Sequence, residues 1–361
     1  MTTRLRVLDF GTVGALASQA VYHGIALAMR ADDDPVLTLV NPSDPYICVG
    51  LHQEIALEVD EAYCQAHQLP IVRRHVGGGA VYLDRHQMFF HFIFPHRRAP
   101  SVVAELYPMF IEPVVRTYQT LGVNANFRPV NDIHVNGRKI GGTGAARIGD
   151  ATVMVGSFMF DFDIDTMALC LKVPSEKFRD KLRTGLKDYI TTLRKELATP
   201  PTREQVKKEF LRQIAHVFQL APLTDVPNAA EKIAITEQER ALSDPEWTYQ
   251  TGRKFVQDGV KIAADTHLTE TAFKAPGGLI RVQLLAKDDR IAGLHISGDF
   301  TVWPNDGMHT LAALLHGVAL DGAALERAIQ QAISTLQLQI PGVEAAHLSQ
   351  AILAAVHHEP K

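Results

Sequence analysis

Two glycine-rich segments contain the residues whose types and spacing best suit the binding of an anion. The first is Arg73-Arg74-His75-Val76-Gly77-Gly78-Gly79-Ala80-Val81-Tyr82. Adjacent arginines offer forked donors that match phosphate or carboxylate, and three glycines let the backbone approach a ligand with several N–H groups. The order strand, glycines, strand excludes a Rossmann fingerprint or a P-loop, because both need a helix after the glycines. The alternative interpretation is a flexible hairpin with two solvated arginines.

The second segment begins at Asn131-Asp132-Ile133 and continues through Gly137-Arg138-Lys139-Ile140-Gly141-Gly142-Thr143-Gly144. Its Asn136-Gly137 pair predicts a hairpin, because both central residues of a type I′ turn need positive φ. Lys139 stands just past this turn, on a strand of small residues that leaves room for a substrate. An ammonium group held there suits neutralisation of a phosphate or polarisation of a carbonyl. Taken alone, the alternative is a surface lysine beside a turn.

Together the two segments resemble the lipoate-protein ligase family, whose pattern is RRxxGGGxVxHD followed by NDI and GxKIxGS. Further stretches are similar to that family: Val155–Asp163, Pro174–Leu197, Gly277–Val282 and Ile296–Phe300. The resemblance covers nearly the whole chain. Two departures stand out, because Leu83 occupies the position of the family's histidine before the retained Asp84, and the arginine that usually follows the second motif is displaced to Arg147.

The resemblance implies that lipoate, or octanoate, reacts with ATP to form lipoyl-AMP, and that the acyl group then passes to a lysine of an apo lipoyl domain or lipoate-carrier protein. Lys139 matches the family's catalytic lysine, which contacts the acyl carbonyl and the phosphate. The family's binding positions match Arg73, Arg74, Gly77, Gly78, Gly79, Ala80, Val81, Tyr82, Asn131, Asp132, Lys139, Gly142, Thr143 and Gly144. Mg²⁺ is expected as an activator, with Asp132 as its candidate contact, and no tightly bound cofactor is expected.

Two other functions remain open. Octanoyltransferases of the same fold form a cysteine acyl-enzyme and need no ATP. The loop before Lys139, residues 127–132, has no cysteine, and Cys170 lies in an apolar run typical of a small buried residue. The second alternative is a non-catalytic binder of lipoylated proteins, which need not keep Arg73-Arg74 and Lys139. A biotin ligase is disfavoured because its GRGRxGR-type loop is missing.

The elements around these motifs predict an α+β fold. The Asn136-Gly137 hairpin, a second turn at Gly149-Asp150 and a strand over 151–162 form an antiparallel meander. Helices are predicted over 13–28, 58–68, 101–121, 175–197 and 203–218. Strands over 279–286 and 291–296, then helices near 310–315 and 322–336, predict a small second domain. We expect a mostly antiparallel sheet flanked by helices in a catalytic domain, residues 1–257, and an α+β accessory domain, residues 258–350.

Composition narrows the classes of partner and location. The chain has 361 residues, 46% of them hydrophobic, so it is large enough for two cores and is not a disordered or fibrous protein. The 36 Lys and Arg against 40 Asp and Glu, with no basic block, argue against a nucleic-acid partner. No apolar run reaches the length of a membrane span. Three cysteines without CxxC spacing predict a reducing, cytoplasmic location and no zinc site.

Overall fold

The fold is described by a computed structural model that covers residues 4–250 and 266–356. By spatial contacts the chain divides into two compact units. Unit 1 consists of Met1–Val49, Ile55–Val76 and Ala80–Thr248, and unit 2 of Gly50–Glu54, Gly77–Gly79 and Tyr249–Lys361. The predicted boundary between residues 257 and 258 lies outside the described residues.

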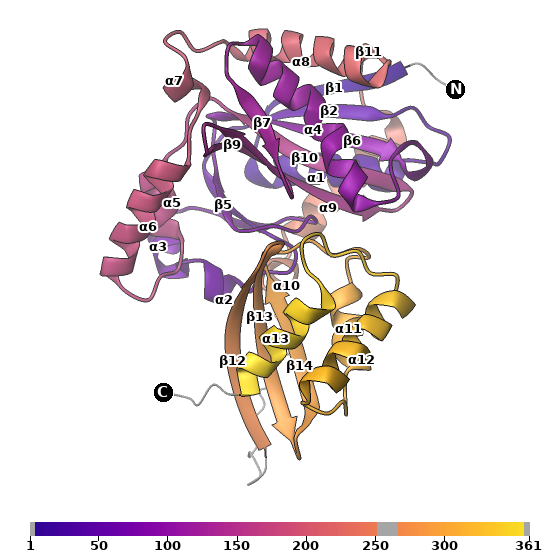
Figure 1. The fold of residues 1–361 in the computed structure, drawn as a ribbon. Helices are drawn as coiled ribbons and strands as arrows, with labels where there is room; N and C mark the ends of the chain where they lie inside the picture. Colours follow the sequence, from indigo (N-terminus) through magenta and orange to yellow (C-terminus); the bar gives the residue numbers. More distant parts are fainter. Residues whose placement is uncertain (1–3, 251–265, 357–361) are drawn as a thin grey trace. The chain divides into compact units, whose positions relative to one another are not determined.

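Unit 1 is built on an eight-stranded sheet with the order β11-β1-β2-β6-β10-β9-β8-β7 (Figure 1). Its strands are β1 (Arg4–Val13), β2 (Val36–Pro42), β6 (Gln87–Pro95), β7 (Ala125–Arg128), β8 (Asp132–Val135), β9 (Arg138–Ile148), β10 (Ala151–Met159) and β11 (Ala221–Asp225). Strand β1 pairs with β11 and β2 in parallel, and each pair from β2 to β7 is antiparallel. The predicted mostly antiparallel α+β sheet is confirmed.

The meander β8-β9-β10 forms through the two predicted turns. Asn136 and Gly137 have φ angles of 50° and 81°, as a type I′ turn requires. Gly149, with a φ of 53°, joins β9 to β10. Local turn chemistry therefore sets the register that places the small-residue strand beside the Asn-Asp-Ile strand.

Helices cover both faces of this sheet, and every residue of β6 is accordingly buried. The covering helices are α1 (Ala15–Ala28), α4 (Val103–Thr120) and α8 (Arg203–Phe218). On one face Tyr22 of α1 packs in one cluster with Phe89. On the other face the ring of Phe92 lies 5.2 Å from that of Phe110 on α4 and 5.8 Å from that of Phe210 on α8. The helices predicted over 13–28, 101–121 and 203–218 are confirmed.

A smaller three-stranded sheet in unit 1 carries the arginine segment. Its order is β4-β3-β5, with β3 (Tyr46–Val49), β4 (Ile71–Arg73) and β5 (Val81–Leu83). The helix predicted over 58–68 is found as the shorter α3 (Glu61–Ala66), and a separate short helix, α2 (Ile55–Glu58), precedes it. Helix α3 begins after Asp60, whose carboxylate accepts a hydrogen bond from the Tyr63 amide at 3.0 Å and so caps it.

The helix predicted over 175–197 is also divided, and this correction affects the candidate site. Helix α6 (Glu176–Tyr189) ends, residues 190–192 are extended, and α7 (Leu193–Glu196) follows. Ile190 pairs with Lys139 in a parallel bridge, and the Thr191 amide donates to the Lys139 carbonyl at 2.9 Å. Helical spacing in the sequence cannot reveal this break, because its cause is a pairing with a strand some fifty residues earlier.

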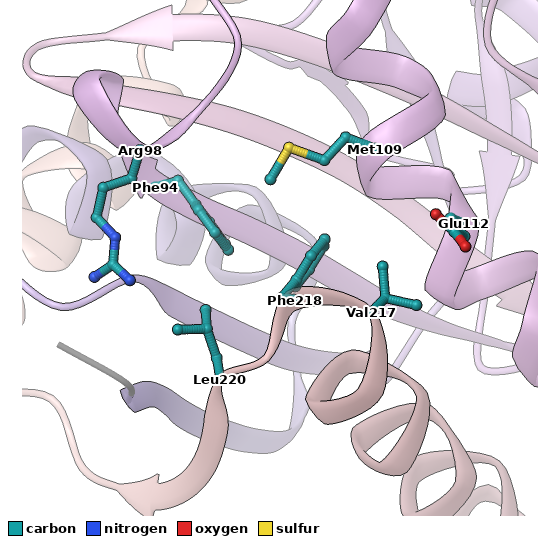
Figure 2. A pocket seen from close by; sticks show the side chains of 7 residues that line it. All are labelled: Phe94, Arg98, Met109, Glu112, Val217, Phe218 and Leu220. Atoms are coloured by element: carbon teal, nitrogen blue, oxygen red, sulfur yellow. The ribbon is translucent and has the colours of Figure 1, made fainter. Parts of the chain in front are cut away.

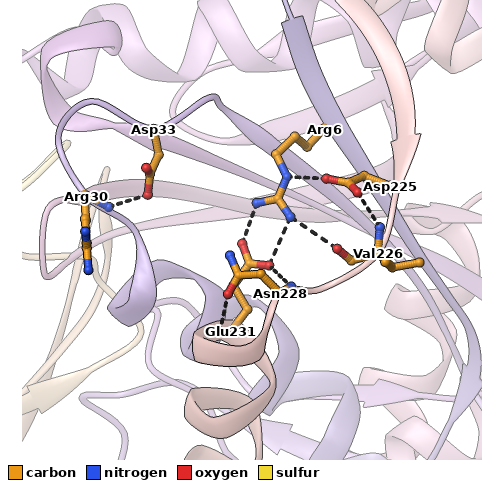
Figure 3. Close-up of polar contacts among 7 residues, drawn as sticks. All are labelled: Arg6, Arg30, Asp33, Asp225, Val226, Asn228 and Glu231. Carbon is orange, nitrogen blue, oxygen red and sulfur yellow. Dashed lines mark hydrogen bonds and ion pairs between the residues drawn. The ribbon is translucent and has the colours of Figure 1, made fainter.

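Strand β11 and the helices α9 (Ala229–Leu242) and α10 (Pro245–Thr248) were not predicted. Arg6 links β1 to the end of β11 and to α9, because its guanidinium lies 2.5 Å from Asp225 and 2.6 Å from Glu231 (Figure 3). Glu231 also closes the capping box that begins at Asn228. That Asn-x-x-Glu spacing was the signal in the sequence that could have identified α9.

Unit 2 contains the antiparallel sheet β12-β13-β14 and three helices. Their bounds are β12 (Thr266–Ala275), β13 (Gly278–Lys287), β14 (Arg290–Gly298), α11 (Gly307–Leu314), α12 (Gly322–Thr335) and α13 (Ala345–Val356). One apolar cluster joins them, including Val282, Leu325 and Ile352. The predicted strand pair and two helices are confirmed, with β12 and α13 in addition. Within the described parts of both units, no helix has the length and apolarity needed to cross a bilayer.

Candidate active site

Lys139 lies on β9 with its ammonium group held by a carboxylate. Its Nζ atom is 2.7 Å from Oδ1 of Asp132, which is on the neighbouring strand β8. The Lys139 side chain keeps 34% of its surface exposed, so the ammonium can reach a bound molecule. The ammonium group therefore has a defined partner on the neighbouring strand, and the catalytic role of Lys139 stays a prediction.

The other oxygen of Asp132 faces two further polar side chains. Its Oδ2 lies 3.6 Å from Nε2 of His134 and 3.4 Å from the hydroxyl of Tyr189 at the end of α6. The Tyr189 hydroxyl is also 3.3 Å from His134 Nε2. His134 did not emerge as a site residue from the sequence, but it lies two positions after Asp132 on β8, and this spacing places both side chains on one face of the strand. Tyr189 could not be found from sequence, because α6 was predicted to continue past it.

Asn131 and Thr143 join the start of β8 to β9. The Asn131 amide donates to the Thr143 carbonyl at 2.6 Å, and both the amide and the hydroxyl of Thr143 donate to the Asn131 carbonyl at 2.9 Å. Between these residues and the lysine, a Cβ on Gly142 would lie 3.0 Å from Lys139 Nζ. The glycine therefore leaves the space that the ammonium group occupies.

Arg73 and Arg74 are buried, with 1% and 9% of their surfaces exposed. The Arg73 guanidinium donates to the Thr248 carbonyl at 3.0 Å, and Trp247 donates its indole N–H to the Arg73 carbonyl at 3.0 Å. The Arg74 guanidinium donates to the Cys48 carbonyl at 3.1 Å. The alternative of two solvated arginines on a flexible hairpin is therefore wrong.

The glycine triplet belongs to unit 2 by its contacts. A Cβ on Gly77 would lie 2.6 Å from the Phe300 carbonyl oxygen, and a Cβ on Gly79 would lie 3.7 Å from the Asp299 side chain. Gly78 has a φ of 96°, which favours glycine. Close backbone packing is therefore a structural reason for Gly77, beside the predicted role in anion binding.

After the triplet, the Tyr82 amide on β5 lies 3.2 Å from the sulfur of Met167, a weak acceptor. Tyr82 is 5% exposed, whereas Ala80 and Val81 are half-buried. A stronger acceptor, such as a phosphate oxygen, would bind this amide better than the thioether does. The predicted role of these residues in binding the nucleotide stays a prediction.

The two motifs meet inside unit 1. Val76, three residues after Arg73, packs in the cluster under the main sheet. A Cβ on Gly144 of β9 would come within 3.2 Å of Val76 Cγ2. The missing side chain at Gly144 therefore allows the arginine segment to lie against the strand that carries Lys139.

The two departures from the family pattern also have defined surroundings. Leu83 packs against apolar clusters of both sheets, so its side chain supplies packing where the family has an imidazole. Arg147 is exposed and donates to the Ser101 carbonyl at 3.0 Å. It follows Lys139 by eight positions on one strand, which at roughly 3.3 Å per residue separates their backbones by about 26 Å. Arg147 therefore does not reach the lysine's surroundings.

All three cysteines, Cys48, Cys64 and Cys170, are buried as free thiols, with no more than 1% of any of them exposed. A hydrogen bond between Cys64 and Cys170, together with burial, raises the pKa of Cys170, and the same hydrogen bond lowers that of Cys64. Neither thiol reaches the surface. The predicted burial of Cys170 is confirmed.

The predicted contact between Asp132 and Mg²⁺ stays a prediction. One oxygen of Asp132 is occupied by Lys139, and no group of three His, Cys, Asp or Glu side chains suited to a metal ion occurs among residues 4–250 and 266–356. Mg²⁺ commonly binds substrate phosphates and water in place of a full set of protein ligands.

A pocket of about 390 Å³ opens on the α4 and α8 side of the sheet (Figure 2). It is lined by Phe94, Arg98, Met109, Glu112, Val217, Phe218 and Leu220. Arg98 comes from the short helix η1 (His96–Arg98), Leu220 from the connection between α8 and β11, and the remaining residues from β6, α4 and the end of α8. No residue of the two motifs lines it, so this pocket is separate from the candidate active site.

Comparison with known proteins supports the resemblance of the motifs. A relative, lipoate–protein ligase 1 of Staphylococcus aureus, is 27% identical over 256 residues, covering 71% of this chain and 73% of that protein. Octanoyltransferase LipM of Kyrpidia tusciae is 27% identical over 271 residues, covering 68% of this chain and 98% of the relative. A solved bipartite lipoate protein ligase from Thermoplasma acidophilum aligns with a TM-score of 0.64 and 25% identity, over 71% of this chain and 99% of that one.

The family model described as the lipoyl protein ligase A/B catalytic domain matches residues 16–215, which is more than half of the chain. The matched range includes both motifs, the strands β8, β9 and β10, and the helix α6 that ends at Tyr189. The chain therefore belongs to the lipoyl protein ligase A/B catalytic domain family.

Proposed function

We propose that this protein is an ATP-dependent lipoate-protein ligase, which activates lipoate or octanoate as the acyl-adenylate and transfers the acyl group to a lysine of an apo lipoyl domain or lipoate-carrier protein. The observation that carries the proposal is the position of the Lys139 ammonium group, 2.7 Å from Asp132. Glycines on the same strand as Lys139 leave the space that this group occupies. Attack of a carboxylate on the α-phosphate brings two anions together, so a fixed cation at that point lowers the barrier.

The competing activity is that of an octanoyltransferase, since one relative bears that name. Such an enzyme needs a thiol that an acyl donor can reach, and a thiolate at neutral pH. Cys170 is fully buried and its pKa is raised, and Cys48 and Cys64 are equally inaccessible. Burial of every cysteine therefore favours the ligase.

The test of this choice is Cys170→Ala. We expect the variant to keep ATP-dependent acylation within about 3-fold of the original protein, because the change removes one buried sulfur and no reacting group. Acylation would be followed by the mass of an acceptor domain, with ATP present and absent. Loss of acyl transfer in Cys170→Ala, together with transfer that does not need ATP, would establish the transferase.

The acceptor class also belongs to the proposal. The similar Thermoplasma ligase was solved in a study that describes it together with its E2 lipoyl domain. We therefore propose a lipoyl domain as the acceptor, with a cytoplasmic location that suits the three unpaired thiols.

A further inference from the structure

The side chains around Lys139 form a chain of hydrogen-bond partners that ends on helix α6. His134 is 6% exposed, and its Nδ1 atom is buried without a hydrogen-bond partner within the described structure. A buried N–H without an acceptor is costly, so the ring proton belongs on Nε2. That atom faces the Tyr189 hydroxyl at 3.3 Å.

This assignment fixes the direction of the remaining donors. The Tyr189 hydroxyl oxygen accepts from His134 and donates its own proton to Asp132 Oδ2 at 3.4 Å. The other carboxylate oxygen accepts from Lys139 at 2.7 Å. Burial and the nearby Asp132 charge raise the pKa of Tyr189, so the hydroxyl stays protonated and remains a donor at neutral pH.

The backbone of the same segment holds the lysine from the other side. The Thr191 amide donates to the Lys139 carbonyl at 2.9 Å, two residues after Tyr189. Thr191 also donates its hydroxyl to Glu196, which accepts from Arg138 at 2.7 Å. Residues 189–196 therefore contact Lys139 through its own backbone and through its carboxylate partner.

We propose that Tyr189 is a positioning residue for Lys139, and that its hydroxyl, placed by the 189–196 segment and by His134, orients the Asp132 carboxylate that holds the lysine ammonium. The inference rests on the proposed function, because the position of Lys139 matters for adenylate formation. It goes beyond that function, since it assigns the end of α6 a role in positioning the Lys139 ammonium group.

The test variant is Tyr189→Phe, which keeps the ring that lies edge-on to His134 at 5.5 Å and removes only the hydroxyl. Loss of one hydrogen bond to a carboxylate corresponds to a 3- to 10-fold effect, as an order of magnitude. We expect kcat for lipoate-dependent ATP–pyrophosphate exchange to fall by about that factor, while the KM for ATP and for lipoate stays nearly constant. Tyr63→Phe is the matched control, because Tyr63 also lies against a histidine ring, His67, but belongs to α3 and packs in a different cluster from Asp132 and Lys139.

A double-mutant cycle separates positioning from a general structural effect. If Tyr189 acts through the carboxylate, Tyr189→Phe will lower kcat in the original protein and have no further effect in an Asp132→Asn background. A fall of equal size in both backgrounds would overturn the inference, and so would an unchanged kcat of Tyr189→Phe itself.

A measurement without ATP keeps this inference distinguishable from the proposed function. Acetylation of Lys139 by limiting acetic anhydride, measured by peptide mass spectrometry against exposed Lys177, reports how firmly Asp132 holds the side-chain nitrogen. Both Tyr189→Phe and Asp132→Asn should label Lys139 faster, by about 3-fold or more. Faster labelling in a protein without exchange activity would leave the positioning role standing and reject the ligase. Unchanged labelling in Tyr189→Phe would reject the positioning role whatever the activity.

Discussion

Lys139 is the residue on which the proposed chemistry depends most. Its ammonium is held 2.7 Å from Asp132 and is one-third exposed, so it can leave the carboxylate side and meet developing phosphate charge. Removing one such charge-stabilising donor commonly costs about 100- to 1000-fold in rate. We expect Lys139→Ala to lower pyrophosphate exchange by that order without changing the melting temperature appreciably. Lys177→Ala, on exposed α6, is the control, and exchange retained in Lys139→Ala would contradict the assigned role.

A substitution at Gly142 tests whether the space around the Lys139 ammonium group matters for activity. A methyl group at this position would lie 3.0 Å from Lys139 Nζ and 3.1 Å from Cε, so the flexible lysine must move away from Asp132. We expect Gly142→Ala to reduce exchange activity by about 10-fold, or about 1.4 kcal/mol in the barrier, with little loss of stability.

The matched control for Gly142→Ala is Gly185→Ala in α6, where a Cβ would meet nothing within 4 Å. That change should keep the activity and stabilise the protein by roughly 0.5–1 kcal/mol, because alanine is the better helix former. Equal activities of the two variants in a pyrophosphate-exchange assay would show that the space at Gly142 has no catalytic importance.

Local sequence signals were sufficient to predict the strands that position Lys139. They were insufficient to predict the contacts that hold its side chain. The hairpin at Asn136-Gly137 was predictable because its turn requires two residues at positive φ. The end of α6 at Tyr189 was not predictable, because residues 190–192 leave the helix to pair with Lys139. The apolar residues in that region keep helical spacing as far as Leu193. The pairing with Lys139, which depends on the tertiary fold, interrupts the helix.

The candidate site shows the same division between local and long-range information. The residue types of the two motifs gave the anion-binding hypothesis. The burial of Arg73 depends on Trp247 and Thr248, which follow it by more than 170 residues. No pattern within the arginine segment could indicate that contact, so the choice between a solvated and a buried arginine needed the fold.

Acid stability is a property of the whole of unit 1, because it holds two buried histidines, His23 and His91, and the half-buried His75. Burial lowers the pKa of His23 to about 4, and of His75 and His91 to about 3. His75 is stacked between His23, 3.5 Å away, and Trp247, 4.2 Å away. The unfolded chain binds protons at these sites near pH 6.5, whereas the folded protein does not. Their stabilisation is therefore complete above pH 6.5 and declines as the pH falls toward 4.

We expect the free energy of unfolding to decrease by roughly 3 kcal/mol per histidine between pH 6.5 and pH 4, since one pKa unit corresponds to about 1.4 kcal/mol. His75→Phe keeps the stacked ring and removes the titration, so its unfolding free energy should depend less steeply on pH, by about one proton. Urea unfolding at several pH values measures this slope. An equally steep dependence in His75→Phe would contradict the account.

The most direct test of the central claim is the intact mass of an apo lipoyl domain after incubation with this protein and lipoate, with and without ATP and Mg²⁺. We predict that the acceptor gains the mass of one lipoyl group only when ATP is present, and that Lys139→Ala abolishes the gain. Acylation that proceeds equally well without ATP from an acyl-carrier donor, or neither acylation nor release of pyrophosphate, would contradict the assignment as an ATP-dependent lipoate-protein ligase.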